Sequence, residues 1–123
     1  MRKLKLIAAL GWTLTILISC LVSAKNISTL HLPFLGYDKV VHAAIYFVLV
    51  IIWVLYFQAI KPITTKIYSR IAFAAFSYGV LIEILQGVLT ADRSADFFDV
   101  IANTIGIIIA TMFFITIKKL KKI

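Results

Sequence analysis

The sequence predicts an all-α integral membrane bundle of four transmembrane helices, and two observations lead to this prediction. Of the 123 residues, 63% are hydrophobic and 15% are charged, and the mean hydropathy is +1.05. Soluble domains are about 45–50% apolar and about 25% charged, and a small soluble domain exposes too much surface to hide such a composition. The apolar residues also gather in four stretches, each near the roughly 20 residues that a membrane span needs. A soluble enzyme domain and a disordered tail are therefore excluded.

The four predicted helices cover about residues 6–24, 40–60, 68–89 and 97–117. Pro62 follows the second stretch, and proline cannot continue a helix interior. The connection between the first two stretches contains Asn, Ser, Pro and Gly, which favour loops. The link between the last two, residues 90–96, is so short that these helices are expected to be antiparallel neighbours. Residues 1–123 are expected to form a single domain.

The positively charged residues predict how the chain crosses the membrane. Ten of the 13 Lys and Arg residues lie before the first helix, between the second and third or in the first turn of the third, or after the fourth. The other three, Lys25, Lys39 and Arg93, lie on the opposite side, together with all five acidic residues. Because short cytoplasmic loops are enriched in Lys and Arg, both termini are expected in the cytoplasm. The net charge of +8 then reflects topology and attraction to anionic lipid, and no nucleic-acid partner is predicted.

The first apolar stretch has one competing interpretation. Basic residues, an apolar run and Val22-Ser23-Ala24 resemble a signal peptide with its cleavage site, and residues 17–20 resemble a lipoprotein box. The run is longer than the roughly 7–15 residues of a typical signal peptide core, which favours a retained helix. Cys20 is the single cysteine, so no disulfide can form within the chain.

Polar and ionisable residues inside a span are costly and usually face the bundle interior or a site. Here they occur at spacings of three or four that place them on one face of each of three helices. They are Asp38, Lys39, His42 and Tyr46; Glu83 and Gln86; and Arg93, Asp96, Asp99 and Asn103, followed by Gly106 and Ala110. Tyr46, Glu83 and Asn103 are expected about 9 Å inward from the outer ends of their helices, and His42 and Asp99 about 3 Å inward. The sequence therefore predicts a polar site that opens to the outer surface.

The same residues have structural interpretations that stay open. Asp38 and Ser94 would serve as helix N-caps, and Asp96 would interact favourably with the positive N-terminus of a helix. His42 and Tyr46 would form interhelical hydrogen bonds. Gly106 and Ala110 would allow close helix packing. Glu83 is the hardest to explain in this way, because a carboxylate about two turns deep needs a cation or a proton. A salt bridge from Glu83 to Lys39 or Arg93 would meet that need.

Together these residues resemble the VanZ-like family of small bacterial membrane proteins, which is named for a determinant of low-level teicoplanin resistance. The resemblance rests on Asp38-Lys39-x-x-His42-x-x-x-Tyr46, on Glu83-x-x-Gln86, and on Arg93-x-x-Asp96-x-x-Asp99-x-x-x-Asn103-x-x-Gly106. It covers about residues 38–110 and implies a cell-envelope setting and four helices. It implies no reaction, because the activity of the family is not established, and it does not imply that this chain confers resistance.

Three functions follow as hypotheses, of which the first is a site that binds or modifies an anionic, lipid-linked or cell-wall-related ligand. His42 and Glu83 are the candidates for general acid or base, with Asp99 orienting the histidine. The ligand-binding candidates are Asp38, Lys39, Tyr46, Gln86, Arg93, Asp96 and Asn103, and among them Lys39 and Arg93 would hold a phosphate. Whether the protein is an enzyme is left open, and so is the identity of any cofactor.

The second hypothesis is a non-enzymatic structural or interaction protein, whose polar layer locks helices together or docks a partner. The third is a transporter or flippase, ranked last because four helices form a narrow bundle whose cytoplasmic half is apolar at residues 48–52 and 107–109. Oligomerisation is left open, since a continuous pathway would need it. A divalent metal stays an open alternative, since His42, Glu83, Asp96 and Asp99 include oxygen and imidazole ligands. No tight spacing such as H-x-x-x-H occurs, so no residue is assigned as a metal ligand.

Overall fold

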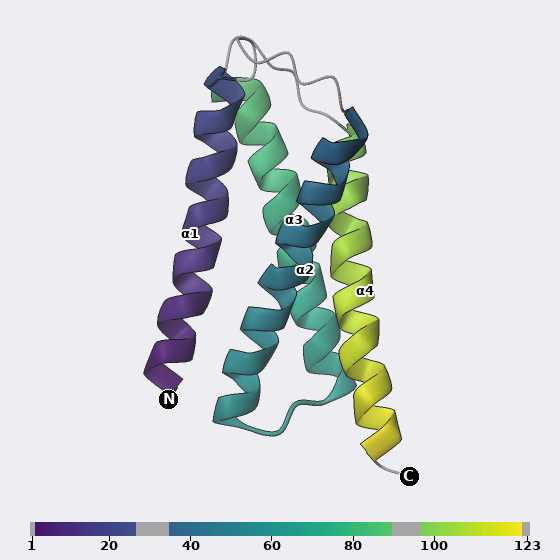
Figure 1. Ribbon diagram of the computed structural model, residues 1–123. Helices are drawn as coiled ribbons and strands as arrows, with labels where there is room; N and C mark the ends of the chain where they lie inside the picture. Colours follow the sequence, from purple (N-terminus) through teal and green to yellow (C-terminus); the bar gives the residue numbers. More distant parts are fainter. Residues whose placement is uncertain (1, 27–34, 90–96, 122–123) are drawn as a thin grey trace.

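The computed structural model describes the backbone of residues 2–26, 35–89 and 97–121, and the side chains of residues 2–21, 39–89 and 97–121. These residues form an antiparallel bundle without a strand (Figure 1). Its helices are α1 (Arg2–Asn26), α2 (Leu35–Ile60), α3 (Thr65–Leu89) and α4 (Phe97–Lys121). All four are long and apolar enough to cross a membrane. The predicted all-α bundle of four membrane-spanning helices is therefore confirmed.

All four helices extend further than the apolar stretches predicted. Helix α1 begins at Arg2, α2 begins at Leu35 rather than near residue 40, α3 begins at Thr65, and α4 continues to Lys121. Hydropathy marks the part of a helix that matches the hydrocarbon layer, whereas backbone hydrogen bonding continues into polar ends whose Lys and Arg side chains extend to water. The end of α2 agrees with the prediction, since the last helical bond runs from Lys61 N–H to the Phe57 carbonyl oxygen (3.1 Å) and Pro62 follows.

The two ends of the bundle differ in charge. Arg2, Lys121 and the connection of residues 61–64 lie together at one end (Figure 1), which we call the basic end. The other Lys and Arg residues described near it are Lys3, Lys5, Lys66, Arg70, Lys118 and Lys119. The opposite end, where α1 and α3 finish and α2 and α4 begin, is called the site end.

Helices α2 and α4 approach one another closely at Gly106. A Cβ atom added to Gly106 would lie 2.0 Å from the carbonyl oxygen of Ala43 and 2.8 Å from its carbonyl carbon. Small residues let transmembrane helices pack with their backbones close together. Ala110, one turn further along α4, is completely buried. The expected role of Gly106 in helix packing is therefore confirmed, and this contact fixes the first turns of α4 against α2.

Thr13 connects α1 to both α2 and α3 near the middle of the bundle. The indole N–H of Trp53 donates to Thr13 Oγ1 (3.0 Å), and the hydroxyl of Tyr78 donates to the Thr13 carbonyl oxygen. The indole N–H of Trp12 donates to the carbonyl oxygen of Ile45 (3.1 Å). Both tryptophans are half-buried, and each donates a hydrogen bond to a neighbouring helix.

A cavity of about 310 Å³ opens beside this connection, between α1, α2 and α3. Its lining is almost entirely apolar and consists of Thr13, Leu49, Val50, Trp53, Phe57, Ile71, Ala74, Ala75 and Tyr78. Leu49 and Val50 follow Tyr46 by about one helical turn, and Ala75 precedes Gly79 by about one turn. The cavity therefore begins next to the polar residues of the site end and extends toward the basic end.

Candidate functional site

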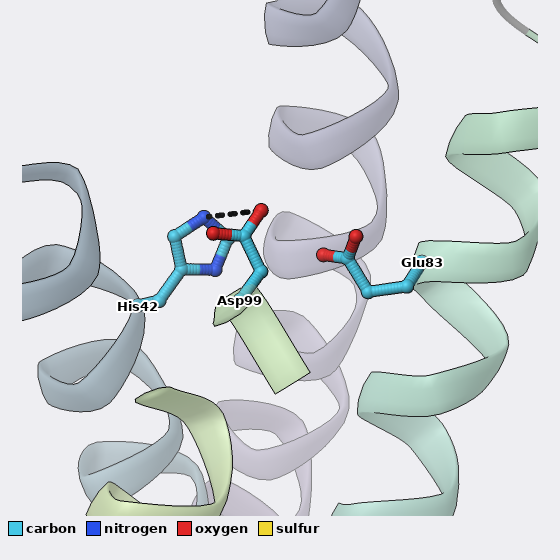
Figure 2. Close-up of side chains that lie close together, drawn as sticks. All are labelled: His42, Glu83 and Asp99. Carbon is cyan, nitrogen blue, oxygen red and sulfur yellow. Dashed lines mark ion pairs between the residues drawn. The ribbon is translucent and has the colours of Figure 1, made fainter. Parts of the chain in front are cut away.

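Three ionisable side chains from three helices meet inside the bundle near the site end. His42 of α2, Glu83 of α3 and Asp99 of α4 each offer a nitrogen or oxygen atom, and these atoms all lie within 4.8 Å of one another. Figure 2 shows the imidazole ring and the two carboxylates pointing toward one another. The exposed fractions of the three residues are 8%, 3% and 0%. We call His42, Glu83 and Asp99 the buried triad.

Asp99 is held from two sides. One carboxylate oxygen, Oδ1, accepts a hydrogen bond from the ammonium group of Lys39, and the other, Oδ2, lies 3.7 Å from His42 Nε2. The Lys39 side chain is 32% exposed, so it extends from the triad toward the surface. Asp99 also lies in the first turn of α4, where a negative charge is favoured by the helix dipole. Lys39 and the N-terminus of α4 therefore both place positive charge beside the Asp99 side chain.

The orientation of the His42 ring is fixed by Asn103. His42 Nδ1 lies 3.2 Å from Asn103 Oδ1. An amide oxygen only accepts hydrogen bonds, so Nδ1 carries the proton and donates. In the neutral ring, Nε2 then presents its lone pair on the side of Asp99. His42 is thus arranged as an acceptor or a ligand at Nε2.

Tyr46 and Gly79 form the floor of the site. Tyr46 is 1% exposed, and its hydroxyl has no hydrogen-bond partner among the described residues. Glu83 is near enough to this phenol to interact with it electrostatically. A Cβ atom added to Gly79 would lie 3.2 Å from Asn103 Nδ2 and 3.3 Å from the Tyr46 ring. Gly79 therefore makes room for both polar side chains.

Gln86 connects the site to α1. Its amide nitrogen donates to the carbonyl oxygen of Cys20 (2.8 Å), and the residue is 2% exposed. This bond joins α3 to α1 one turn closer to the site end than Glu83. Gln86 was predicted as a ligand-binding residue. The structure shows its side chain in a hydrogen bond between two helices, and its role toward a ligand stays a prediction.

The structure brings together most of the residues that the sequence singled out, namely Lys39, His42, Glu83, Asp99 and Asn103, with Tyr46 beside Glu83. The predicted depth of His42 was too small. Because α2 begins at Leu35, His42 lies about 10 Å from the helix start rather than about 3 Å. Arg93, Ser94, Asp96 and the side chain of Asp38 lie outside the described residues.

Two residues of the site were missed in the sequence, Gly79 and Ala43. Both are small. Gly79 shares a helix face with a residue that was singled out, and Ala43 is next to one in the sequence. Gly79 precedes Glu83 by four residues, and Ala43 follows His42 directly. A small residue one turn below a membrane-embedded carboxylate is the signal that points to Gly79, because helix neighbours four apart share a face.

The chain was compared with known proteins and families. No curated protein and no solved structure matches it. The sequence model of the VanZ/LLP1 family matches residues 2–118, which is nearly the whole chain and covers α1, α2, α3 and α4 as far as Lys118. The chain, with its membrane-spanning helices and buried triad, therefore belongs to the VanZ/LLP1 family.

Proposed function

We propose that this protein binds the anionic headgroup of a lipid or lipid-linked, cell-wall-related ligand at the outer surface of the bacterial cytoplasmic membrane. The observation that carries the proposal is the buried triad, in which Asp99 accepts a hydrogen bond from Lys39. Lys39 places a cation between the triad and the surface, where it would meet a phosphate first. His42 and Glu83 would accept or donate protons to a ligand held there.

The apolar cavity supports an amphiphilic ligand. A headgroup at Lys39 and the triad would stand about two helical turns from the cavity bounded by Leu49, Val50 and Ala75. Ligand sites are often apolar clefts of about 300–1,000 Å³ with a few convergent polar groups. The cavity of about 310 Å³ suits one hydrocarbon chain or part of it. The same ligand would thus place its charge in the triad and its chain between α1, α2 and α3.

The charges at the two ends of the bundle support the proposed outward orientation of the site. Nearly all described Lys and Arg residues lie near the basic end, and the positive-inside rule assigns that end to the cytoplasm. The test uses single cysteines in a Cys20→Ser background, probed on intact cells with a membrane-impermeant maleimide. We expect labelling of Leu89→Cys, at the site end, and none of Lys66→Cys, at the basic end. The reverse pattern would place the site in the cytoplasm.

Ligand binding is tested by lipid mass spectrometry on protein extracted in polymer nanodiscs. We expect a phosphate-bearing or other anionic lipid to be enriched over the bulk membrane. Lys39→Gln should reduce this enrichment about tenfold, since a charge-assisted hydrogen bond contributes about 1.5–3 kcal/mol. Lys66→Gln removes an exposed lysine at the basic end and is the matched control. Equal enrichment in both variants would contradict the proposal.

A structural role is the second candidate, because the same contacts tie helices together. Lys39 to Asp99 and His42 to Asn103 join α2 to α4, and Gln86 joins α3 to α1. On this hypothesis, His42→Ala and Glu83→Gln would deplete the protein from the membrane. Normal abundance of both variants combined with loss of the bound lipid would favour the ligand-binding function.

A further inference from the structure

We infer that the buried triad is a binding site for one divalent transition-metal ion of the Mn²⁺ or Zn²⁺ type. His42 Nε2, one oxygen of Glu83 and Asp99 Oδ2 are the ligands. The inference rests on the proposed function for the ion's role, because the ion would supply positive charge to an anionic headgroup. Binding of the ion itself, however, is measured without any lipid.

The spacing of the three donor atoms fits a shared ion. One nitrogen or oxygen atom of each residue lies within 4.8 Å of those of the other two, and His42 Nε2 and Asp99 Oδ2 are 3.7 Å apart. That separation is too long for a hydrogen bond. Two ligands bound to one ion at about 2.0–2.2 Å lie roughly 3–4 Å apart. A small rotation of the Glu83 side chain would complete the set.

The far side of each of two ligands is already held by another residue. Asn103 Oδ1 accepts from His42 Nδ1, and this fixes the ring with Nε2 toward Asp99. Lys39 donates to Asp99 Oδ1, which leaves Oδ2 on the side of the histidine. Metal-binding imidazoles and carboxylates are commonly oriented by such hydrogen bonds to their remaining atoms. Lys39 therefore complements an ion in the triad, because the two occupy different oxygens of Asp99.

Tyr46 is an independent observation that points to a ligand in the same place. Its hydroxyl is buried and has no hydrogen-bond partner among the described side chains and backbone groups, and its ring packs at Gly79 beside Asn103, which holds His42. Buried hydroxyl groups nearly always have a partner. Water or an oxygen ligand bound to an ion beside Glu83 would supply one. The ion would keep open positions for that purpose, as catalytic or ligand-binding metals do.

The donor set selects the class of metal. Carboxylate and water oxygens suit Mg²⁺, Ca²⁺ and Mn²⁺, whereas imidazole suits Zn²⁺ and other transition metals. One imidazole with two carboxylates therefore favours Mn²⁺ or Zn²⁺ over Mg²⁺. The sequence contains these ligand types, but their spacing predicted no metal site, because the three ligands stand on three different helices. H-x-x-x-H and similar spacings detect only ligands that share one helix or loop.

The experiment is a metal titration of purified, EDTA-stripped protein in detergent, followed by isothermal calorimetry and, for Mn²⁺, by electron paramagnetic resonance. We expect about one Mn²⁺ or Zn²⁺ per chain, and weaker Mg²⁺ binding. Asp99→Asn and Glu83→Gln should weaken the affinity for the metal at least tenfold. Asn103 orients His42 without binding the ion, so Asn103→Leu should weaken this affinity by about tenfold. Thr111→Val removes a buried hydroxyl elsewhere on α4, and His31→Asn removes the other histidine of the chain. Both should bind as the wild type does.

Wild-type protein that is folded by circular dichroism and binds no ion would overturn the inference, whatever the variants do. Unchanged affinity in folded Asp99→Asn and Glu83→Gln would overturn it as well. The lipid measurement distinguishes failure of the metal-site inference from failure of the proposed lipid-binding function. Lipid enrichment that persists in EDTA without any metal binding removes the metal and keeps the proposed function. Metal binding without lipid enrichment supports the metal site and removes the proposed ligand.

Discussion

Gly106 of α4 lies directly against the backbone of Ala43 of α2. A Cβ atom at position 106 would stand 2.0 Å from the Ala43 carbonyl oxygen and 3.1 Å from its Cα atom. His42 precedes Ala43, and Asn103 lies one turn before Gly106, so this contact sets the separation between the two residues that form the His42–Asn103 hydrogen bond. The closest helix packing in the site end and the orientation of the imidazole therefore depend on the same glycine.

The first prediction is that Gly106→Ala separates α2 from α4. The added methyl group meets backbone atoms, which cannot rotate away, so we expect a loss of about 1–3 kcal/mol in the free energy of unfolding. The measurement is equilibrium unfolding in mixed micelles, followed by circular dichroism. Gly11→Ala is the control, because no atom lies within 4 Å of a Cβ at that position. Alanine is the better helix former by about 1 kcal/mol, so Gly11→Ala should be neutral or stabilising. Equal stability of the two variants would contradict the close packing.

The second prediction concerns the connection of α1 through Thr13. Thr13→Val removes the acceptor of the Trp53 indole N–H and should reduce stability by about 1 kcal/mol, within the range measured for hydrogen bonds between membrane helices. Thr15→Val is the matched control. Thr13 and Thr15 both donate to the carbonyl oxygen four residues earlier, at 2.7 Å, but Thr15 is exposed. Unfolding monitored by tryptophan fluorescence should therefore shift for Thr13→Val alone. A similar shift in both variants would mean that the loss comes from within α1.

The fold was largely predictable from the sequence, because membrane spans are set by length and apolarity. All four apolar stretches became helices, and Pro62 marked the end of α2. The start of α2 at Leu35 was missed, because the first residues of this helix are less hydrophobic than the rest and lie outside the apolar stretch. The contribution of α1 was also missed. Thr13 looks like an ordinary residue of an apolar run, and only the position of Trp53 on a neighbouring helix gives it a role.

The candidate site was predictable as a set of residues and not as a geometry. Spacings of four placed His42 and Tyr46 on one face, and the cost of burying charge drew attention to Glu83 and Asp99. Nothing in the sequence, however, gives the rotation of one helix about its axis relative to another. Which oxygen of Asp99 faces Lys39 and which faces His42 depends on that rotation. The metal-ligand arrangement could therefore only be found once three helices were placed together.

The third prediction is that Lys39 and Asp99 are energetically coupled. A double-mutant cycle with Lys39→Met and Asp99→Asn, measured by unfolding in EDTA, should give a coupling energy of about 1–3 kcal/mol. Asp99 is completely buried, so loss of its partner costs more than at a surface pair, whereas the partial exposure of Lys39 limits the value. Lys66→Met with Asp99→Asn is the control cycle, because Lys66 lies near the basic end. A coupling energy near zero in the first cycle would show that the contact does not stabilise the fold.

The fourth prediction separates the site from the stability of the bundle. Gly79→Ala places a methyl group 3.2 Å from Asn103 Nδ2 and 3.3 Å from Tyr46 Cε1, so both side chains must move by a few tenths of an ångström. They are side-chain groups and can yield, and the better helix propensity of alanine, about 1 kcal/mol, offsets the crowding. The free energy of unfolding should therefore stay within about 1 kcal/mol of the wild-type value.

The ion-binding consequence of Gly79→Ala should be larger than its effect on stability. Asn103 holds Nδ1 of His42, and displacing the amide turns the imidazole away from Asp99. We expect Mn²⁺ affinity to fall about tenfold, as it does when the hydrogen-bond partner of a metal-binding histidine is disturbed. Gly11→Ala provides the comparison, since it changes helix propensity on α1 with nothing within 4 Å. If Gly79→Ala bound Mn²⁺ as tightly as Gly11→Ala, the position of Asn103 would have no influence on the ligand at His42. The hydrogen bond would then serve only to hold α2 and α4 together.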